Sequence, residues 1–275
     1  KPGAVPGSAP DPGAAPATSG ASATGPAGDA GAMARPAPDM AVSPGPAAYP
    51  GPPGNPGPPG DPAAEAAPIA PGRDGFLAAF PVSRETLARL DRFLDLLAKA
   101  QARTNLVAAS TLADPWLRHV ADSAQLLDLA PPGARWADIG AGAGFPGMVL
   151  AIMGAEVELI EPRRLRADFL RHAVADLGLE ARARVHQARA ETVRLKPPGA
   201  ITARAVAHVD KLFDWGGRFA AQETRFILPR GSAAAQELMD ARTRFHLARA
   251  RLVPSRTAPG SAILVAQGVS QKRGC

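Results

Sequence analysis

Four glycines gather in one short stretch of the sequence, WADIGAGAGFPGMVLAIMG at residues 136–154. Gly140, Gly142, Gly144 and Gly147 stand between an apolar run that contains an acid and a second apolar run. Glycine permits a positive φ and a close approach of the backbone to a ligand, and Pro146 presets φ for the first turn of a helix. Because a helix start presents free N–H groups, the loop is suited to an anion or a carboxylate.

An acid follows this loop at a distance typical of nucleotide-binding sheets. Glu161 ends the next apolar run, 21 residues after Gly140, where a carboxylate accepts hydrogen bonds from two ribose hydroxyls. A glycine loop with such an acid serves either a dinucleotide or S-adenosylmethionine. The spacing GxGxG followed by Phe-Pro-Gly lacks the third glycine of GxGxxG and favours the methyl donor, with a purely structural tight turn as the remaining alternative.

Short apolar runs alternate with helical patterns around this loop, which predicts an α/β fold with a parallel sheet covered on both faces. Strands are predicted at 135–141, 156–161, 183–188, 200–205 and 225–230, with helices near 147–153, 163–178 and 208–220. The last two runs, 245–253 and 261–269, are joined by PSRTAPG, which leaves no room for a crossover helix, so they predict an antiparallel hairpin at the sheet edge. The glycine loop then lies at the carboxyl edge, where open parallel sheets bind ligands.

A small helical unit precedes the sheet. Ser83 can cap a helix whose leucines recur at helical spacing. Asp114-Pro115 breaks the chain, and a second helix is predicted from Trp116 through Leu127 until Pro131-Pro132. We therefore expect a helical extension at 73–132 and a sheet domain at 133–275.

Residues 1–72 differ in composition from the rest of the chain. They hold 19 Pro, 13 Gly and three residues of the set Leu, Ile, Val and Phe, too few large apolar side chains to offset the entropy of ordering the backbone, so a disordered tail is predicted. Four glycines at a spacing of three within GPPGNPGPPGDP match the collagen period, but four triplets are too few for a triple helix. The tail lacks the apolar core of a signal peptide.

The charge distribution indicates a polyanionic partner. The tail carries 2 basic and 5 acidic residues, which leaves 29 basic and 20 acidic residues, a net charge of +9, in the remainder. Such a surface favours nucleic acid, although Arg-rich composition also follows from a GC-rich genome. The only cysteine is Cys275, so a disulfide framework, a Cys-ligated metal and a core cysteine nucleophile are not expected. No apolar run is long enough to span a membrane, and we expect a cytoplasmic protein.

The order of several motifs resembles one family. TNLVAAS, WLRHVADSAQL, DIGAGAGFPG, ELIEPRRLRADFLR, ARAET, TARAV and LPRG together look like the RsmG (GidB) family of bacterial 16S rRNA guanine-N7 methyltransferases. The resemblance covers about residues 80–268 and not the tail. It implies a Rossmann-like class I methyltransferase with a seven-strand, mostly parallel sheet and a terminal antiparallel hairpin, S-adenosyl-L-methionine as donor, and 16S rRNA or the 30S ribosomal subunit as partner. We expect a monomer, although the sequence leaves the oligomeric state open.

Matching positions imply site residues. By resemblance, the donor is contacted at Gly140, Phe145, Ala190, Glu191 and Arg204; Glu161 takes the ribose on the independent ground given above.

The motif RHVADS supplies two further candidates, Arg118 and His119. Arg118, like Arg204, meets phosphate or the donor's carboxylate, or else forms a surface ion pair. His119 either bridges the donor pocket to the helical unit or bonds Asp122. The basic set that begins the helix at 163–178 faces either RNA or solvent; its members are Arg163, Arg164, Arg166 and Arg171.

The chain departs from the family pattern at three places. Ala100 stands five residues before Asn105, where relatives usually carry Trp. Leu165 stands where a basic residue commonly follows the ribose acid, and Arg230 replaces the Lys of LKG, which keeps the charge but changes its geometry. We expect these changes to tune RNA affinity.

Methylation of guanine N7 needs little from the protein. N7 has an exposed lone pair and loses no proton, so no general base and no covalent nucleophile are required, and orientation alone contributes about 7–11 kcal/mol. No metal site is expected. No catalytic residue is therefore predicted. Two other functions stay open: an NAD-dependent oxidoreductase on a related sheet, and a non-catalytic rRNA-binding assembly factor.

Overall fold

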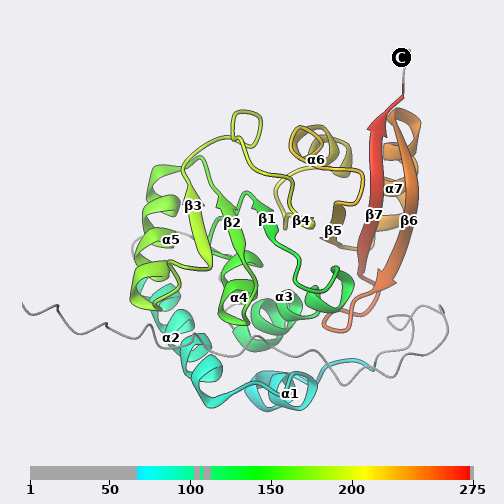
Figure 1. The fold of residues 1–275 in the computed structure, drawn as a ribbon. Helices are drawn as coiled ribbons and strands as arrows, with labels where there is room; N and C mark the ends of the chain where they lie inside the picture. The colour runs from blue at the N-terminus through cyan, green and yellow to red at the C-terminus, as the bar shows by residue number, and fades with distance from the viewer. Residues whose placement is uncertain (1–66, 102–105, 108–112, 273–275) are drawn as a thin grey trace, which may run out of the picture. The chain divides into compact units, whose positions relative to one another are not determined.

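The computed structural model describes residues 67–101, 106–107 and 113–272. In this part of the chain a seven-stranded sheet has the strand order β3-β2-β1-β4-β5-β7-β6 (Figure 1). The strands are β1 (Trp136–Ile139), β2 (Val157–Ile160), β3 (Ala183–His186), β4 (Ala200–Thr202), β5 (Arg225–Arg230), β6 (Phe245–Pro254) and β7 (Ala262–Gln271). The first five run parallel, and β7 pairs antiparallel with β5 and β6. The predicted sheet, including its terminal hairpin, is confirmed.

Helices cover both faces of the sheet. One apolar cluster joins the sheet to α2 (Arg84–Gln101), α4 (Gly147–Ile152) and α5 (Arg164–Asp176), and the other joins it to α6 (Val209–Gly216) and α7 (Ala234–Arg244). Successive strand residues point to opposite faces. In β1, accordingly, Trp136 packs in the first cluster and Ala137 in the second.

The helical unit begins with α1 (Gly72–Ala79) and α2. The Thr86 N–H donates to Ser83 Oγ at 3.1 Å, so Ser83 caps α2 as predicted. The continuous helix predicted between Trp116 and Pro131-Pro132 is instead three short pieces: a π-helix (Trp116–Ala121), α3 (Asp122–Ala124) and a 3₁₀ turn (Leu127–Leu129). A π-helix is rare and frequently lies at a functional site.

Two helices were not predicted. The α1 segment GRDGFLAA contains two glycines, and α7, AAQELMDARTR, has Leu238 and Met239 as its only large apolar residues, so neither shows a clear apolar stripe.

The boundary of the predicted tail also needs a correction. Ile69 is buried, and its N–H donates to the Arg256 carbonyl at 2.8 Å, so the core reaches into 67–72. The remainder of that prediction, at 1–66, lies outside the described residues.

Candidate functional site

A cavity of about 820 Å³ lies at the carboxyl ends of β1, β2, β4 and β5. The π-helix and the loop between β6 and β7 complete its wall. Its β1–β2 half is lined by residues 140–143, Phe145, 161–163 and Arg166, and its β4–β5 half by 204–206, 229–231, Glu237 and the β6–β7 loop. At about 4.8 Å per strand step, the ends of β2 and β5 lie roughly 14 Å apart, so the cavity is long enough for two ligands side by side.

The glycine loop forms the floor of the β1–β2 half with no side chain larger than a methyl group between residues 140 and 144. Gly140, Gly142 and Gly144 have φ of +72°, +55° and +94°, which other residues adopt only with strain. A Cβ on Gly140 would lie 2.7 Å from Cγ2 of Val206. The loop therefore provides an open, backbone-lined surface.

The start of α4 does not present its first amides to a ligand, contrary to the sequence-based expectation. The Gly147 N–H donates to Asp138 Oδ2 at 2.9 Å, and the Met148 N–H donates to the Gly144 carbonyl at 2.8 Å. Asp138 is completely buried, and this burial raises its pKa to about 7 against the opposing effects of the Gly147 N–H and of Arg204. The acid in β1 thus holds the helix start from below the loop.

Glu161 lies at the end of β2 on the cavity wall and is almost fully buried. Its Oε2 accepts from the Gly142 N–H at 2.9 Å, and its Oε1 accepts from the Arg163 N–H at 2.8 Å. Each carboxylate oxygen has about two acceptor sites, so the backbone fixes the orientation of Glu161 while both oxygens can still accept from a ligand.

Phe145, His119 and Arg204 form a stacked group over the glycine loop. The His119 ring lies 4.5 Å from the Phe145 ring at an interplanar angle of 15°, and the Arg204 guanidinium lies 5.2 Å from the same ring. Arg204 donates to the Arg118 carbonyl, to Asp122 Oδ2 and to His119 Nδ1 at 3.2, 3.1 and 2.9 Å.

His119 therefore bridges the helical unit and the loop after β4. Burial, with the charges of Arg204 and Arg118, lowers the pKa of His119 to about 4. The ring is neutral near pH 7, and since Nδ1 accepts from Arg204, its proton lies on Nε2.

Ala190 and Glu191 are not among the residues that line the cavity. Ala190 is buried in the apolar cluster on the α6 side of the sheet, and Glu191 Oε1 lies 3.7 Å from Arg189. Of the basic set, Arg163 and Arg166 line the cavity, whereas Arg164 and Arg171 pair with Asp168 at 3.7 and 2.8 Å.

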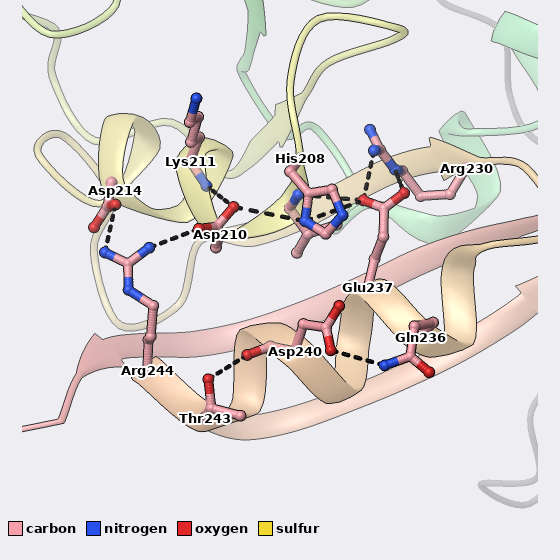
Figure 2. Close-up of polar contacts among 11 residues, drawn as sticks. His208, Asp210, Lys211, Asp214, Arg230, Gln236, Glu237, Asp240, Thr243 and Arg244 are labelled. Atoms are coloured by element: carbon pink, nitrogen blue, oxygen red, sulfur yellow. Dashed lines mark hydrogen bonds and ion pairs between the residues drawn. The ribbon is translucent and has the colours of Figure 1, made fainter.

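The sequence patterns missed most of the β4–β5 half. Ala205 has φ of +55°, a strained conformation for a residue with a Cβ. Arg230 and Glu237 form an ion pair on the cavity wall (Figure 2). Of these residues, only Arg230 could be singled out from the sequence, because it lies in the motif LPRG. Glu237 belongs to α7, the helix that was not predicted.

None of the described helices is long and apolar enough to cross a membrane. Within the described ranges, no group of three or more His, Cys, Asp or Glu side chains is placed to hold a metal ion. Ala100 packs partly buried against the core, while Asn105, to which the family pattern relates it, lies outside the described residues.

Comparisons with known proteins point to one family. Residues 86–259 match the family model GidB, described as rRNA small subunit methyltransferase G. Ribosomal RNA small subunit methyltransferase G of Rhodospirillum centenum is 48% identical over 191 residues, which cover 69% of this chain and 87% of that protein. The protein of the same name from Rhizorhabdus wittichii is 43% identical over 197 residues, covering 70% of this chain and 90% of that protein.

Proposed function

Because the chain belongs to the rRNA small subunit methyltransferase G family, we propose that it transfers a methyl group from S-adenosyl-L-methionine to N7 of a guanine in 16S rRNA. The observation that carries this proposal is the cavity, which places an open glycine floor beside a buried, oriented carboxylate at the carboxyl edge of β1 and β2. Ligands of open α/β sheets bind at this edge.

The residues of the β1–β2 half fit an adenosyl group. The loop at residues 140–144 leaves room for the ligand because it carries no side chain larger than a methyl group. Glu161 accepts the ribose hydroxyls, and Phe145 and Arg204 border the same space. For Ala190 and Glu191, the proposed role as donor contacts rests on the family resemblance alone.

The chemistry asks for orientation rather than proton transfer. S-adenosylmethionine supplies an electrophilic methyl group: the N7 lone pair forms the new N–C bond, the S–C bond breaks with its electrons going to sulfur, and no proton is released. The protein has to hold the base in line and exclude water. The neutral His119 and the clamped Arg204 give the wall a fixed geometry for this purpose.

Methyl transfer to isolated 30S subunits tests the proposal. Subunits from cells that lack the gene are incubated with labelled donor, and the rRNA is digested and analysed by mass spectrometry. We expect one labelled 7-methylguanosine per particle. RNA binding without labelled product would favour an assembly factor, and calorimetric binding of NAD in preference to the methyl donor would favour an oxidoreductase. Naked 16S rRNA, run in parallel, identifies whether RNA alone is a substrate.

A further inference from the structure

We propose that Glu237, held by Arg230, reads the Watson–Crick edge of the target guanine. This inference rests on the proposed function and assigns the β4–β5 half of the cavity to the base. Arg230 is the last residue of β5 and Glu237 lies in the first turn of α7. Both line the cavity, about three strand steps from Glu161 (roughly 14 Å). A donor whose ribose is bound at Glu161 leaves this end to the acceptor.

The Glu237 carboxylate is buried but retains room for one more donor. Its side chain is 9% exposed and that of Arg230 is 11% exposed. Arg230 donates to Oε2 from Nη2 at 2.5 Å and to Oε1 from Nε at 3.3 Å, and the Val209 N–H donates to Oε2 at 3.3 Å. A carboxylate has about four acceptor sites, and Oε1 carries a single, long hydrogen bond. Oε1 is therefore the oxygen that is available to a ligand.

Other ion pairs, besides the one that Glu237 forms, hold α7 against α6. Arg244 at the end of α7 already bonds Asp210 at 2.6 Å and Asp214 at 3.0 Å on α6 (Figure 2). Leu238 and Ala241 bury the inner side of the same helix. Because the desolvation of a buried ion pair offsets much of its Coulomb attraction, a pair on a cavity wall is better explained by a ligand than by stability.

The other carboxylate in this part of the cavity is committed to the structure. Asp122 accepts from Thr257 Oγ1 and Gln125 Nε2 at Oδ1, and from Arg204 at Oδ2, at 2.7, 3.0 and 3.1 Å. These bonds fasten the π-helix region to the β6–β7 loop and to the loop after β4. Glu237 is thus the better acceptor for a base.

Guanine presents a donor that the free site on Oε1 can accept. The 2-amino group lies with N1–H on the edge opposite N7, so a carboxylate that accepts from the 2-amino group leaves N7 uncovered. Adenine presents a lone pair at N1, which the carboxylate repels, and this selects against it. When N7 is methylated the base becomes cationic, and its N–H groups become stronger donors. A carboxylate on this edge therefore binds the transition state more tightly than the ground state.

The test pairs Glu237→Gln with a change in the base. Particles are reconstituted with guanine or inosine at the target position, since inosine lacks only the 2-amino group. For the wild type we expect kcat/KM to be about tenfold lower on inosine, and for Glu237→Gln about 100-fold lower on guanine, the order for losing bonds to a charged acceptor. Glu237→Gln should show less than about a twofold further loss on inosine, because the two changes remove the same interaction.

Asp240→Asn is the matched control, since Asp240 is exposed on the same helix and bonds only Gln236 and the Thr243 hydroxyl in the described part of the chain. It should keep wild-type rates and the wild-type thermal midpoint. Glu237→Gln should melt at a lower temperature, because Arg230 loses its charged partner, but it should keep the wild-type donor affinity when measured well below its own midpoint. If Glu237→Gln does not fold, Glu237→Asp is measured in the same way; its retained charge should preserve the penalty on inosine.

A full tenfold inosine penalty in Glu237→Gln, or wild-type activity of this variant, would overturn the role of Glu237. A wild-type protein that forms no 7-methylguanosine on guanine particles overturns the proposed function itself.

Discussion

The Glu161→Gln substitution probes the donor site with little change in volume. In the structure the two oxygens of Glu161 accept from the Gly142 and Arg163 amides, and we infer that they also accept from two ribose hydroxyls. Glutamine keeps one oxygen and replaces the other with an NH₂ group. That group faces a backbone N–H, so two donors oppose each other where the ligand should bind.

The expected magnitude follows from these bonds. A hydrogen bond to a charged group contributes about 1.5–3 kcal/mol, and about 1.4 kcal/mol corresponds to tenfold in affinity. Loss of one such bond raises the dissociation constant of S-adenosylmethionine by at least about tenfold. The substitution also leaves one backbone amide without its acceptor, which lowers the free energy of unfolding. Affinity therefore has to be measured well below the thermal midpoint of the variant.

Isothermal calorimetry with S-adenosylmethionine measures the effect. Glu158→Gln is the matched control, because Glu158 lies on the same strand, bonds His186 at 2.6 Å and does not line the cavity. Its donor affinity should equal that of the wild type. An unchanged dissociation constant in a folded Glu161→Gln protein would refute the assignment of Glu161 to the ribose.

Three further substitutions test the architecture of the site. Gly140→Ala places a Cβ on a residue with positive φ and brings this Cβ to 2.7 Å from Val206. We expect the free energy of unfolding, measured by denaturant titration, to fall by about 1–2 kcal/mol. Adding Val206→Ala should relieve the clash but leave the backbone strain. The pKa of Asp138 is raised from 3.8 to about 7, so this group lowers the free energy of unfolding progressively as pH rises from about 4 to 7. The thermal midpoint of the wild type should therefore fall over this range, and Asp138→Asn should abolish the fall. An equal fall in both proteins would contradict the argument that burial raises this pKa. The pKa of His119 is lowered from 6.5 to about 4, so its contribution to the free energy of unfolding is fully present above pH 6.5 and is lost as pH falls toward 4. The variant His119→Phe keeps a ring beside Phe145, and its thermal midpoint should depend less on pH in this range.

The fold could be predicted because the strands of a covered parallel sheet leave an obvious pattern. Runs such as RFILPR give β5 at its observed bounds, and PSRTAPG is too short for a crossover, which fixes the hairpin. Helix α7 escaped prediction because alanines and one leucine suffice to bury its inner side against the sheet. A weak stripe of this kind is decided by tertiary packing rather than by local propensity.

The candidate site divides in the same way. Gly140 and Glu161 could be found because their spacing follows the strand-loop-strand geometry. The hydrogen bonds that join Arg204 to His119 and Asp122 connect residues more than 80 positions apart, and no local pattern encodes such contacts. The occupied amides of α4 were mispredicted because Asp138, read only as the end of an apolar run, bonds the helix start from within β1.

A crystal structure with S-adenosylhomocysteine, the demethylated product of the donor, tests the central claim most directly. We expect density for the adenosyl group across the glycine loop, with both ribose hydroxyls within hydrogen-bonding distance of the Glu161 carboxylate and the sulfur facing the β4–β5 half. Density in any other place, or a ribose that does not contact Glu161, would contradict it.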